Sequence, residues 1–164
     1  MLSSVDQTIW GSSPAQLGLT EDQWEFEQRW LKNFNESSDA LDWEEWKRYW
    51  CEDGFFKFCS LPKIEGKVEL EKYFVEYFKG YKQLKHNATR HSFDVSKGII
   101  YQSLTVSSII QGDEEDKVIF TEGITVIHKH LGESQVHGLE VHADISQLMA
   151  RINEVNSRVA AKND

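Results

Sequence analysis

A histidine, His91, lies in the middle of the stretch NATRHSFDV, which spans residues 87–95. The alternation within this stretch favours a short β-strand, which would place the imidazole on one face of a sheet. In a half-apolar pocket, burial lowers the pKa of a histidine, and the ring can then exchange a proton with a bound molecule. Two interpretations stay open: a catalytic base, or a histidine that supports the structure or contacts a ligand without reacting.

A second group of histidines lies at residues 128–130, in the sequence HKH. Together with Glu133 and Gly138 it approaches the first metal-binding motif of the cupins, but each interval is shorter than in that motif. A cupin also needs more strands than the helical first half of this chain allows. We therefore expect no bound metal.

The two cysteines, Cys51 and Cys59, are eight residues apart with no neighbouring cysteine or histidine in the sequence. This spacing does not favour a zinc site, and no group that would activate a nucleophilic thiol is evident. Glycine-rich phosphate loops and G-x-S-x-G elbows are also absent from the sequence. We expect no cofactor and no serine hydrolase activity.

The composition limits the partners that the chain can have. Its 164 residues are enough for one domain with a substantial core, and the formal net charge is −9. Such a charge repels nucleic acid and anionic membranes, so a small molecule or a protein is the expected partner. The amino terminus has no basic segment followed by an apolar one, and no stretch is long enough to cross a bilayer. We expect a cytoplasmic protein.

The first part of the chain is predicted to be helical. Residues 1–19 are rich in Ser, Gly and Gln, and we expect a flexible arm. Thr20 and Gln23 match a capping box that begins a helix of about four turns. Asp42 can cap a second helix, and Gly66 precedes a third. The apolar stripes of these helices contain Trp24, Trp30, Leu31 and Phe34, then Trp43, Trp46 and Trp50, then Leu70, Tyr73, Phe74, Tyr77, Phe78 and Tyr81.

The second part of the chain changes to a period of two, which is typical of strands. A strand is expected at residues 55–59, and four more follow in a row, joined by short turns. Asp144 can cap a closing helix. One domain is expected over residues 20–158, with a disordered tail at 159–164. The four consecutive strands are predicted at residues 88–95, 98–112, 117–130 and 135–141.

This order of elements resembles the nuclear transport factor 2-like superfamily, particularly its SnoaL-like branch of polyketide cyclases, isomerases and scytalone dehydratases. The similarity lies in W-x3-FN at residues 30–35, DWEEW at 42–46, TRHSF at 89–93 and GLEVHADISQLMARI at 138–152. It implies an α+β fold, a cone-like roll with three N-terminal helices packed on a curved, mainly antiparallel sheet and a short C-terminal helix. A small apolar ligand would bind inside the cone.

The resemblance also implies a set of site residues. His91 matches a pocket histidine of the scytalone dehydratases, and Asn35 matches a pocket aspartate. An amide can orient a ligand or donate to it, but cannot act as a base. The ligand is expected to contact Trp30, Phe34, Phe74, Phe78, Leu104, Ser108, Thr125 and Val141.

The catalytic sets of the relatives are not intact. The second histidine of the dehydratases falls at Ser108 and their pocket asparagine at Thr125, whereas the histidine and aspartate of the cyclases fall at Thr125 and Val141. The resemblance implies a cofactor-independent isomerase, cyclase or dehydratase acting on a hydrophobic polyketide- or terpenoid-like metabolite through His91. The alternative is a non-catalytic module of the same fold that binds a small ligand or another protein.

The face of strand 117–130 that lines the pocket also has two interpretations. If Thr125 points inward, Ile119, Thr121 and Ile127 do too, and the outward face carries mainly apolar residues. That face would then need a cover, and we expect a homodimer through it. With the opposite orientation, Glu122 enters the cavity as another acid–base candidate.

Overall fold

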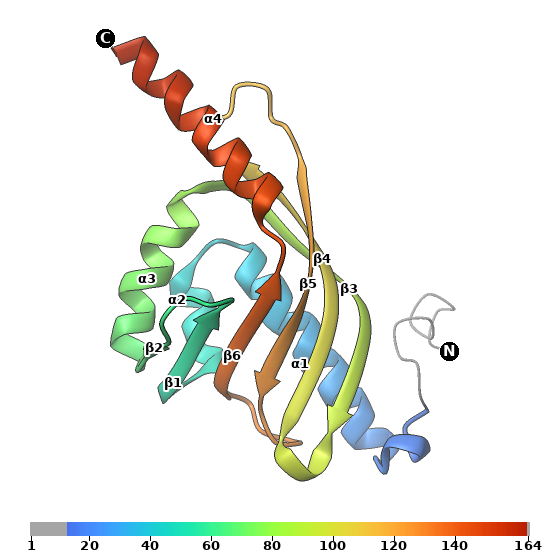
Figure 1. Cartoon of the computed structure of the whole chain (residues 1–164). Helices are drawn as coiled ribbons and strands as arrows, with labels where there is room; N and C mark the ends of the chain where they lie inside the picture. The colour runs from blue at the N-terminus through green and yellow to red at the C-terminus, as the bar shows by residue number, and fades with distance from the viewer. Residues whose placement is uncertain (1–12, 164) are drawn as a thin grey trace.

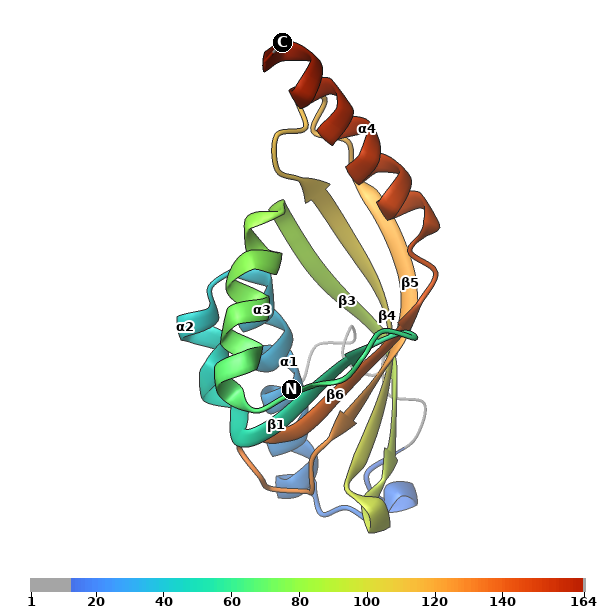
Figure 2. The same cartoon turned by 60° about the vertical axis from the view of Figure 1, so that its left-hand side comes forward.

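A curved, open sheet of six strands carries three helices on its concave side in the computed structural model, which describes residues 13–163 (Figure 1). The strand order is β2-β1-β6-β5-β4-β3. Figure 2 shows α1, α2 and α3 together on one side of the sheet. The predicted α+β roll is confirmed. Within residues 13–163, no helix is both long enough and apolar enough to span a bilayer.

Helix α1 (Glu21–Asp39) begins at the predicted capping box. The Thr20 hydroxyl accepts from the Gln23 backbone N–H at 3.2 Å, and the Gln23 side chain accepts from the Thr20 N–H at 2.9 Å. Of the predicted arm, residues 1–12 lie outside the described residues, whereas a 3₁₀ turn, η2 (Ala15–Leu17), leads to the buried Leu19.

The second helix is shorter than its tryptophan spacing predicts. Helix α2 (Trp43–Trp46) is capped by the Asp42 carboxylate, which accepts from the Glu44 N–H, and continues as the 3₁₀ turn η3 (Lys47–Tyr49). Strand β1 (Trp50–Phe58) then starts at Trp50, five residues before the predicted strand. Cys59 follows that strand with a φ of 50°, so it lies in a turn.

Helix α3 (Lys67–Lys79) follows the two-residue strand β2 (Ile64–Glu65) and stops before Tyr81. Tyr81 instead begins β3 (Tyr81–Asp94), which is longer than the predicted strand at residues 88–95. A residue such as Tyr81 fits the apolar face of either a helix or a strand, so local spacing alone could not fix this boundary.

The predicted antiparallel meander is confirmed. The short 3₁₀ turn η4 (Val95–Lys97) joins β3 to β4 (Ile99–Ile110), and β5 (Ile119–His128) and β6 (Val136–Ala143) follow. Each pairs with the preceding strand. β6 also pairs in parallel with β1, which links the two halves of the chain.

An aromatic core fills one end of the roll. Trp46 packs edge-on against Trp50 and Phe74, with ring centroids 5.2 and 4.8 Å apart. Trp43 stacks on Phe74 at 5.5 Å, and Phe34 lies 5.3 Å from Trp46. These side chains come from α1, α2, β1 and α3, so the core joins the three helices to the sheet.

A buried ion pair holds α1 against the turn between β5 and β6. The Lys129 ammonium lies 2.6 Å from Glu27 Oε2, and the two side chains are 0% and 1% exposed. The other carboxylate oxygen accepts the Gly132 backbone N–H at 2.8 Å. Burial lowers the pKa of Lys129, and the adjacent Glu27 carboxylate opposes that shift.

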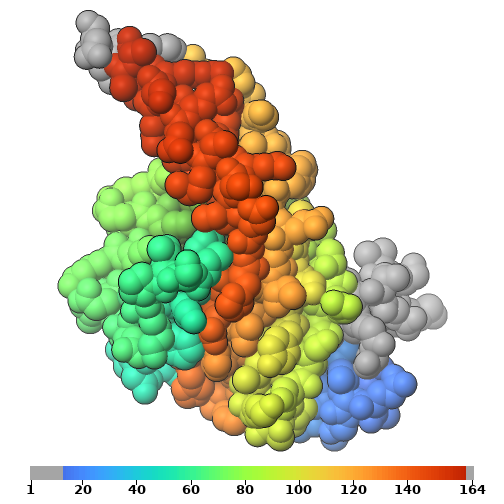
Figure 3. Space-filling model, in the orientation of Figure 1, coloured from blue at the N-terminus to red at the C-terminus, as the bar shows by residue number. Residues whose placement is uncertain are grey.

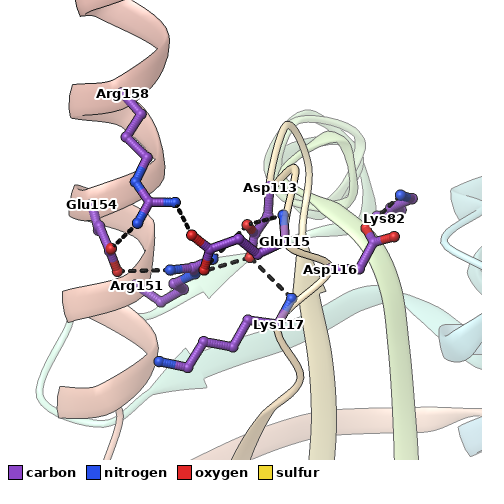
Figure 4. Close-up of polar contacts among 8 residues, drawn as sticks. All are labelled: Lys82, Asp113, Glu115, Asp116, Lys117, Arg151, Glu154 and Arg158. Atoms are coloured by element: carbon purple, nitrogen blue, oxygen red, sulfur yellow. Dashed lines mark hydrogen bonds and ion pairs between the residues drawn. The ribbon is translucent and has the colours of Figure 1, made fainter.

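The closing helix α4 (Ser146–Asn163) has 18 residues, so it is not short, and it includes residues 159–163 of the predicted tail. It projects beyond the sheet beside the turn between β4 and β5 (Figures 1 and 3). The Arg151 guanidinium binds both carboxylate oxygens of Asp113 in that turn, at 2.9 and 2.5 Å (Figure 4). Glu115 and Glu154 accept further bonds from Arg151, so one buried cation anchors the helix.

Candidate functional site

An inner cavity of about 100 Å³ lies between the concave face of the sheet and helices α1, α2 and α3. Aromatic and aliphatic side chains make up most of its wall, and a few polar side chains interrupt it. This is the composition of a site for a small, largely apolar molecule. The polar side chains of the wall, apart from two tyrosines, are Asn35, Ser38, His86, Gln102, Ser108, Thr121 and Thr125.

The structure places eight of the ten predicted site residues on this wall. His91 and Trp30 are not among the lining side chains. The Trp30 indole N–H donates to the Ser134 carbonyl at 2.9 Å, and its ring lies 4.7 Å from the Lys129 ammonium, so Trp30 packs around the buried ion pair. The residues on the wall are Phe34, Asn35, Phe74, Phe78, Leu104, Ser108, Thr125 and Val141.

His91 is connected to the cavity through Gln102. Its side chain faces the concave side and is 8% exposed, and its Nε2 lies 2.7 Å from Gln102 Nε2. Gln102, which lines the cavity, accepts from Asn35 Nδ2 through Oε1 at 3.3 Å. The amide NH₂ of Gln102 therefore donates to His91, which requires an unprotonated Nε2. Asn35, Gln102 and His91 form a polar row from the cavity wall into the sheet.

The electrostatic surroundings of His91 favour its neutral form. Burial lowers the pKa of His91 to about 4. Protonation would also place the ring N–H against the NH₂ of Gln102, two donors facing each other. At neutral pH this imidazole is uncharged and accepts one hydrogen bond from Gln102.

Strand β5 has the first of its two predicted orientations. Thr121 and Thr125 line the cavity, and Ile119 and Ile127 are buried, whereas Glu122 is exposed. Glu122 is therefore excluded as an acid–base group inside the cavity.

Two buried polar atoms of lining residues have no hydrogen-bond partner among the described residues. One is the Thr125 hydroxyl, in a side chain that is 7% exposed, and the other is the indole N–H of Trp46, which is 3% exposed. Buried polar groups are nearly always hydrogen-bonded, so the indole N–H can donate to a molecule in the cavity, and the hydroxyl can donate to it or accept from it.

A groove of about 520 Å³ between α3 and α4 adjoins the cavity. Its wall shares five side chains with the cavity, among them Tyr77 and Tyr81, whose hydroxyls hydrogen-bond at 3.1 Å. Burial raises the pKa of both phenols, so they stay protonated and can donate. The other three shared side chains are Phe58, Ile145 and Leu148.

Four polar parts of the wall were not predicted from the sequence: Ser38, Gln102, the tyrosine hydroxyls and His86. Gln102 alternates with Ile100 and Leu104, so its inward position could have been found from that period of two. His86 lies outside the predicted strand at residues 88–95, although it belongs to β3. Its Nδ1 lies 2.5 Å from the Asp39 carboxylate at the end of α1.

Within residues 13–163, one group of possible metal ligands lies outside the cavity. Ligand atoms of Cys51, Asp53 and His137 all lie within 4.8 Å of one another, and two of these residues are exposed. Cys51 has no histidine near it in the sequence, but His137 lies near it in space because β6 pairs with β1. His128 is not part of this group, and its Nε2 lies 2.8 Å from Glu140.

The architecture is similar to several solved structures. PrhC from Penicillium brasilianum NBRC 6234 is 17% identical, with a TM-score of 0.66 over 86% of this chain and 92% of that one. A protein assigned as a SnoaL-like polyketide cyclase from Shewanella denitrificans OS-217 is 12% identical, with a TM-score of 0.65 over 79% of this chain and 98% of that one. An NTF2-like protein of unknown function from Exiguobacterium sp. 255-15 is 12% identical, with a TM-score of 0.57 over 70% of this chain and 98% of that one.

No family model matches the sequence, and no curated protein matches it at a significant level. At these identities the likeness shows the fold alone. The chain has the nuclear transport factor 2-like fold expected from the sequence, and SnoaL-like proteins are among its structural neighbours.

Proposed function

We propose that the chain binds a small, largely apolar metabolite in the inner cavity and transforms it without a cofactor. The reaction class is proton transfer, as in an isomerisation, cyclisation or dehydration of a polyketide- or terpenoid-like molecule. A cytoplasmic location is part of the proposal, and fractionation of producing cells tests it.

The observation that carries the proposal is the combination of an apolar wall with two unpaired polar atoms. The Thr125 hydroxyl and the Trp46 indole N–H are buried without a partner in the described chain, among aromatic and aliphatic side chains. A carbonyl or hydroxyl group of a ligand could pair with either atom while its hydrocarbon part fills the remaining space.

The polar row gives the ligand a fixed donor. Asn35 has a second amide hydrogen besides the one bonded to Gln102, and its side chain lines the cavity. Because Gln102 faces the cavity and His91 does not, the proposal gives His91 a positioning role in place of the expected role of base. His91 holds Gln102, and Gln102 holds Asn35.

The groove sets the length of the ligand. The inner cavity accepts a compact group, and the groove between α3 and α4 has room for an apolar extension. The tyrosine hydroxyls at the junction can donate to a polar group between these two parts. This shape fits a polyketide or terpenoid skeleton better than a single small ring.

A titration with the neutral apolar probe N-phenyl-1-naphthylamine tests binding. Probe fluorescence should rise with the wild-type chain, and Val141→Trp, which fills the cavity from β6, should weaken binding at least tenfold. Val75→Trp is the matched control, because Val75 is 39% exposed on α3 and does not line the cavity. Thermal melting shows that each variant is folded. Equal probe affinities for wild type and folded Val141→Trp would reject the cavity as the binding site.

The outer face of the sheet favours a second function, association of two copies of the chain. Large apolar residues are exposed there: Tyr101 by 40% on β4, Phe120 by 64% on β5, and Val118 by 43% directly before β5. Phe120 lies on β5 and, unlike Thr121 and Thr125, does not line the cavity. A cluster of this kind is typical of an interface. It supports the homodimer expected from the sequence.

Sedimentation velocity tests the dimer. The wild-type chain should sediment as a dimer, and Phe120→Lys should shift it toward the monomer by placing a charge in the centre of the apolar face. Val68→Lys, on an equally exposed valine of α3, should leave the dimer intact. A monomeric wild type at all concentrations would contradict this second proposal.

A further inference from the structure

His86 brings a second imidazole to the cavity, and this one belongs to the wall itself. It lies on the edge strand β3 opposite Val106 of β4, and both residues line the cavity. The side chain of His86 is 19% exposed. The polar row described above does not include it.

Asp39, the last residue of α1, fixes the orientation of this ring. Its Oδ1 lies 2.5 Å from His86 Nδ1, and both carboxylate oxygens accept the His86 backbone N–H at 3.1 Å. That N–H is available because β3 has a neighbour on one side only. An ionised carboxylate can only accept, so Nδ1 carries a proton and Nε2 of the neutral ring is unprotonated.

The two histidines of β3 therefore have opposite surroundings. A protonated His86 would face a carboxylate, whereas a protonated His91 would face the NH₂ group of Gln102. A carboxylate can accept from the ring in either protonation state, whereas an amide NH₂ can pair only with an unprotonated ring nitrogen. His86 Nε2 has no hydrogen-bond partner within the described part of the chain, which leaves it for a molecule in the cavity.

Asn35 is close enough along α1 to act with this pair. Asn35 and Asp39 are four residues apart, so they lie on the same side of the helix. Asn35 and His86 both line the cavity. A ligand there can accept a hydrogen bond from the Asn35 amide at a carbonyl oxygen and present a neighbouring C–H group to the imidazole.

We propose that His86, oriented by Asp39, is the catalytic acid–base residue of the cavity, and that its substrate is an apolar carbonyl compound with an acidic C–H next to the carbonyl. Nε2 removes that proton, and the electron pair of the C–H bond moves into the carbonyl to give an enolate. Asn35 donates to the enolate oxygen, and Asp39 neutralises the imidazolium. In a substrate with a carbon–carbon double bond beside that C–H group, the Nε2 proton then returns to the far carbon of the resulting dienolate, so the product is the conjugated isomer. The inference rests on the proposed function, because it needs a ligand in the cavity.

Deuterium uptake by 2-tetralone, a small apolar ketone, tests the proton transfer. In D₂O, the wild-type chain should accelerate uptake next to the carbonyl above the buffer rate, as followed by mass spectrometry. His86→Gln should lower the protein-dependent rate by about 10²- to 10⁴-fold, the usual contribution of general base catalysis. His142→Gln is the control, because the His142 side chain is 53% exposed on β6, and its rate should equal that of the wild type.

Chemical rescue separates a base from a structural tie between α1 and β3. In His86→Ala, added imidazole can occupy the space of the missing ring and should restore protein-dependent uptake, after the rate with imidazole alone is subtracted. A ring that only connects α1 to β3 would give no such recovery. Asp39→Asn, which keeps an acceptor for the His86 N–H, should lower the rate at least tenfold.

The outcomes separate this inference from the proposed function. Loss of uptake in His86→Gln with unchanged binding of N-phenyl-1-naphthylamine, together with recovery by imidazole, supports the inference. A wild type that binds the probe without accelerating uptake, or a His86→Gln variant as active as the wild type, overturns the inference and leaves the binding site in place. A wild type that does not bind the probe removes both.

Discussion

The buried His91 should make the chain lose stability in acid over a defined pH range. Burial lowers the pKa of this ring from 6.5 to about 4, whereas in the unfolded chain it titrates near 6.5. Above pH 6.5 the ring is neutral in both states and pH has no effect through it. As the pH falls below 6.5, the unfolded chain takes up a proton that the folded chain refuses, so the free energy of unfolding decreases until the folded ring also titrates.

The size of this loss follows from the shift. Each pKa unit corresponds to about 1.4 kcal/mol, so the full effect is roughly 3 kcal/mol. Between about pH 7.5 and pH 4.5, roughly 2.5 kcal/mol of it should appear. Carboxylates also lose their partners in acid, so the quantity to measure is the difference between the wild type and His91→Gln, whose amide can still accept from Gln102.

Urea unfolding at a series of pH values measures this difference. At pH 7.5 the wild type should be as stable as His91→Gln or more stable. Between pH 7.5 and pH 4.5, the free energy of unfolding of the wild type should fall by roughly 2.5 kcal/mol more than that of the variant. The NMR signal of the His91 ring should show no titration above about pH 5. A ring that titrates at pH 6 or above, or parallel stability curves for the two proteins, would refute the account of a neutral, buried His91.

Three further predictions concern the framework around the cavity. Glu27→Gln leaves the buried Lys129 without its carboxylate and should lower the free energy of unfolding in urea by roughly 3–5 kcal/mol. Glu27→Leu combined with Lys129→Met should lower it far less. Equal losses of stability in the single and the double variant would contradict a buried ion pair. Thr20→Ala removes the cap of α1 and should cost about 1 kcal/mol in the same assay, and no change would mean that the cap is not formed in solution. Arg151→Met should speed amide hydrogen exchange throughout α4. In the wild type the same increase should appear in acid, because Arg151 lowers the pKa of Asp113 and the pair is lost only as the pH falls through that lowered value; slow exchange in the variant would contradict the anchoring role.

Local sequence patterns predicted the elements whose boundaries are set by local chemistry. The capping box at Thr20 begins α1 as expected, and the period of two places the four strands of the meander. The errors fall on Trp50 and Tyr81, which continue an aromatic stripe beyond the end of its helix. Each instead begins a strand, because pairing with distant strands outweighs the local spacing.

In the candidate site, too, some features were predictable from the local sequence and others depend on contacts between distant elements. The apolar wall was predictable because large apolar residues at helical and strand spacings face a common core. The polar contacts were not, since Gln102, His91 and Asn35 come from three elements and meet only after the sheet curls. The Asp39–His86 pair depends on where α1 ends relative to an edge strand, and that arrangement has no signature along the chain.

A crystal structure of the chain with bound N-phenyl-1-naphthylamine tests the cavity most directly. We expect density for the probe inside the roll, with its rings against Phe74 and Leu104 and its amine within roughly 3 Å of the Thr125 hydroxyl. Density for the probe on the outer face of the sheet beside Phe120, with nothing bound inside, would contradict it.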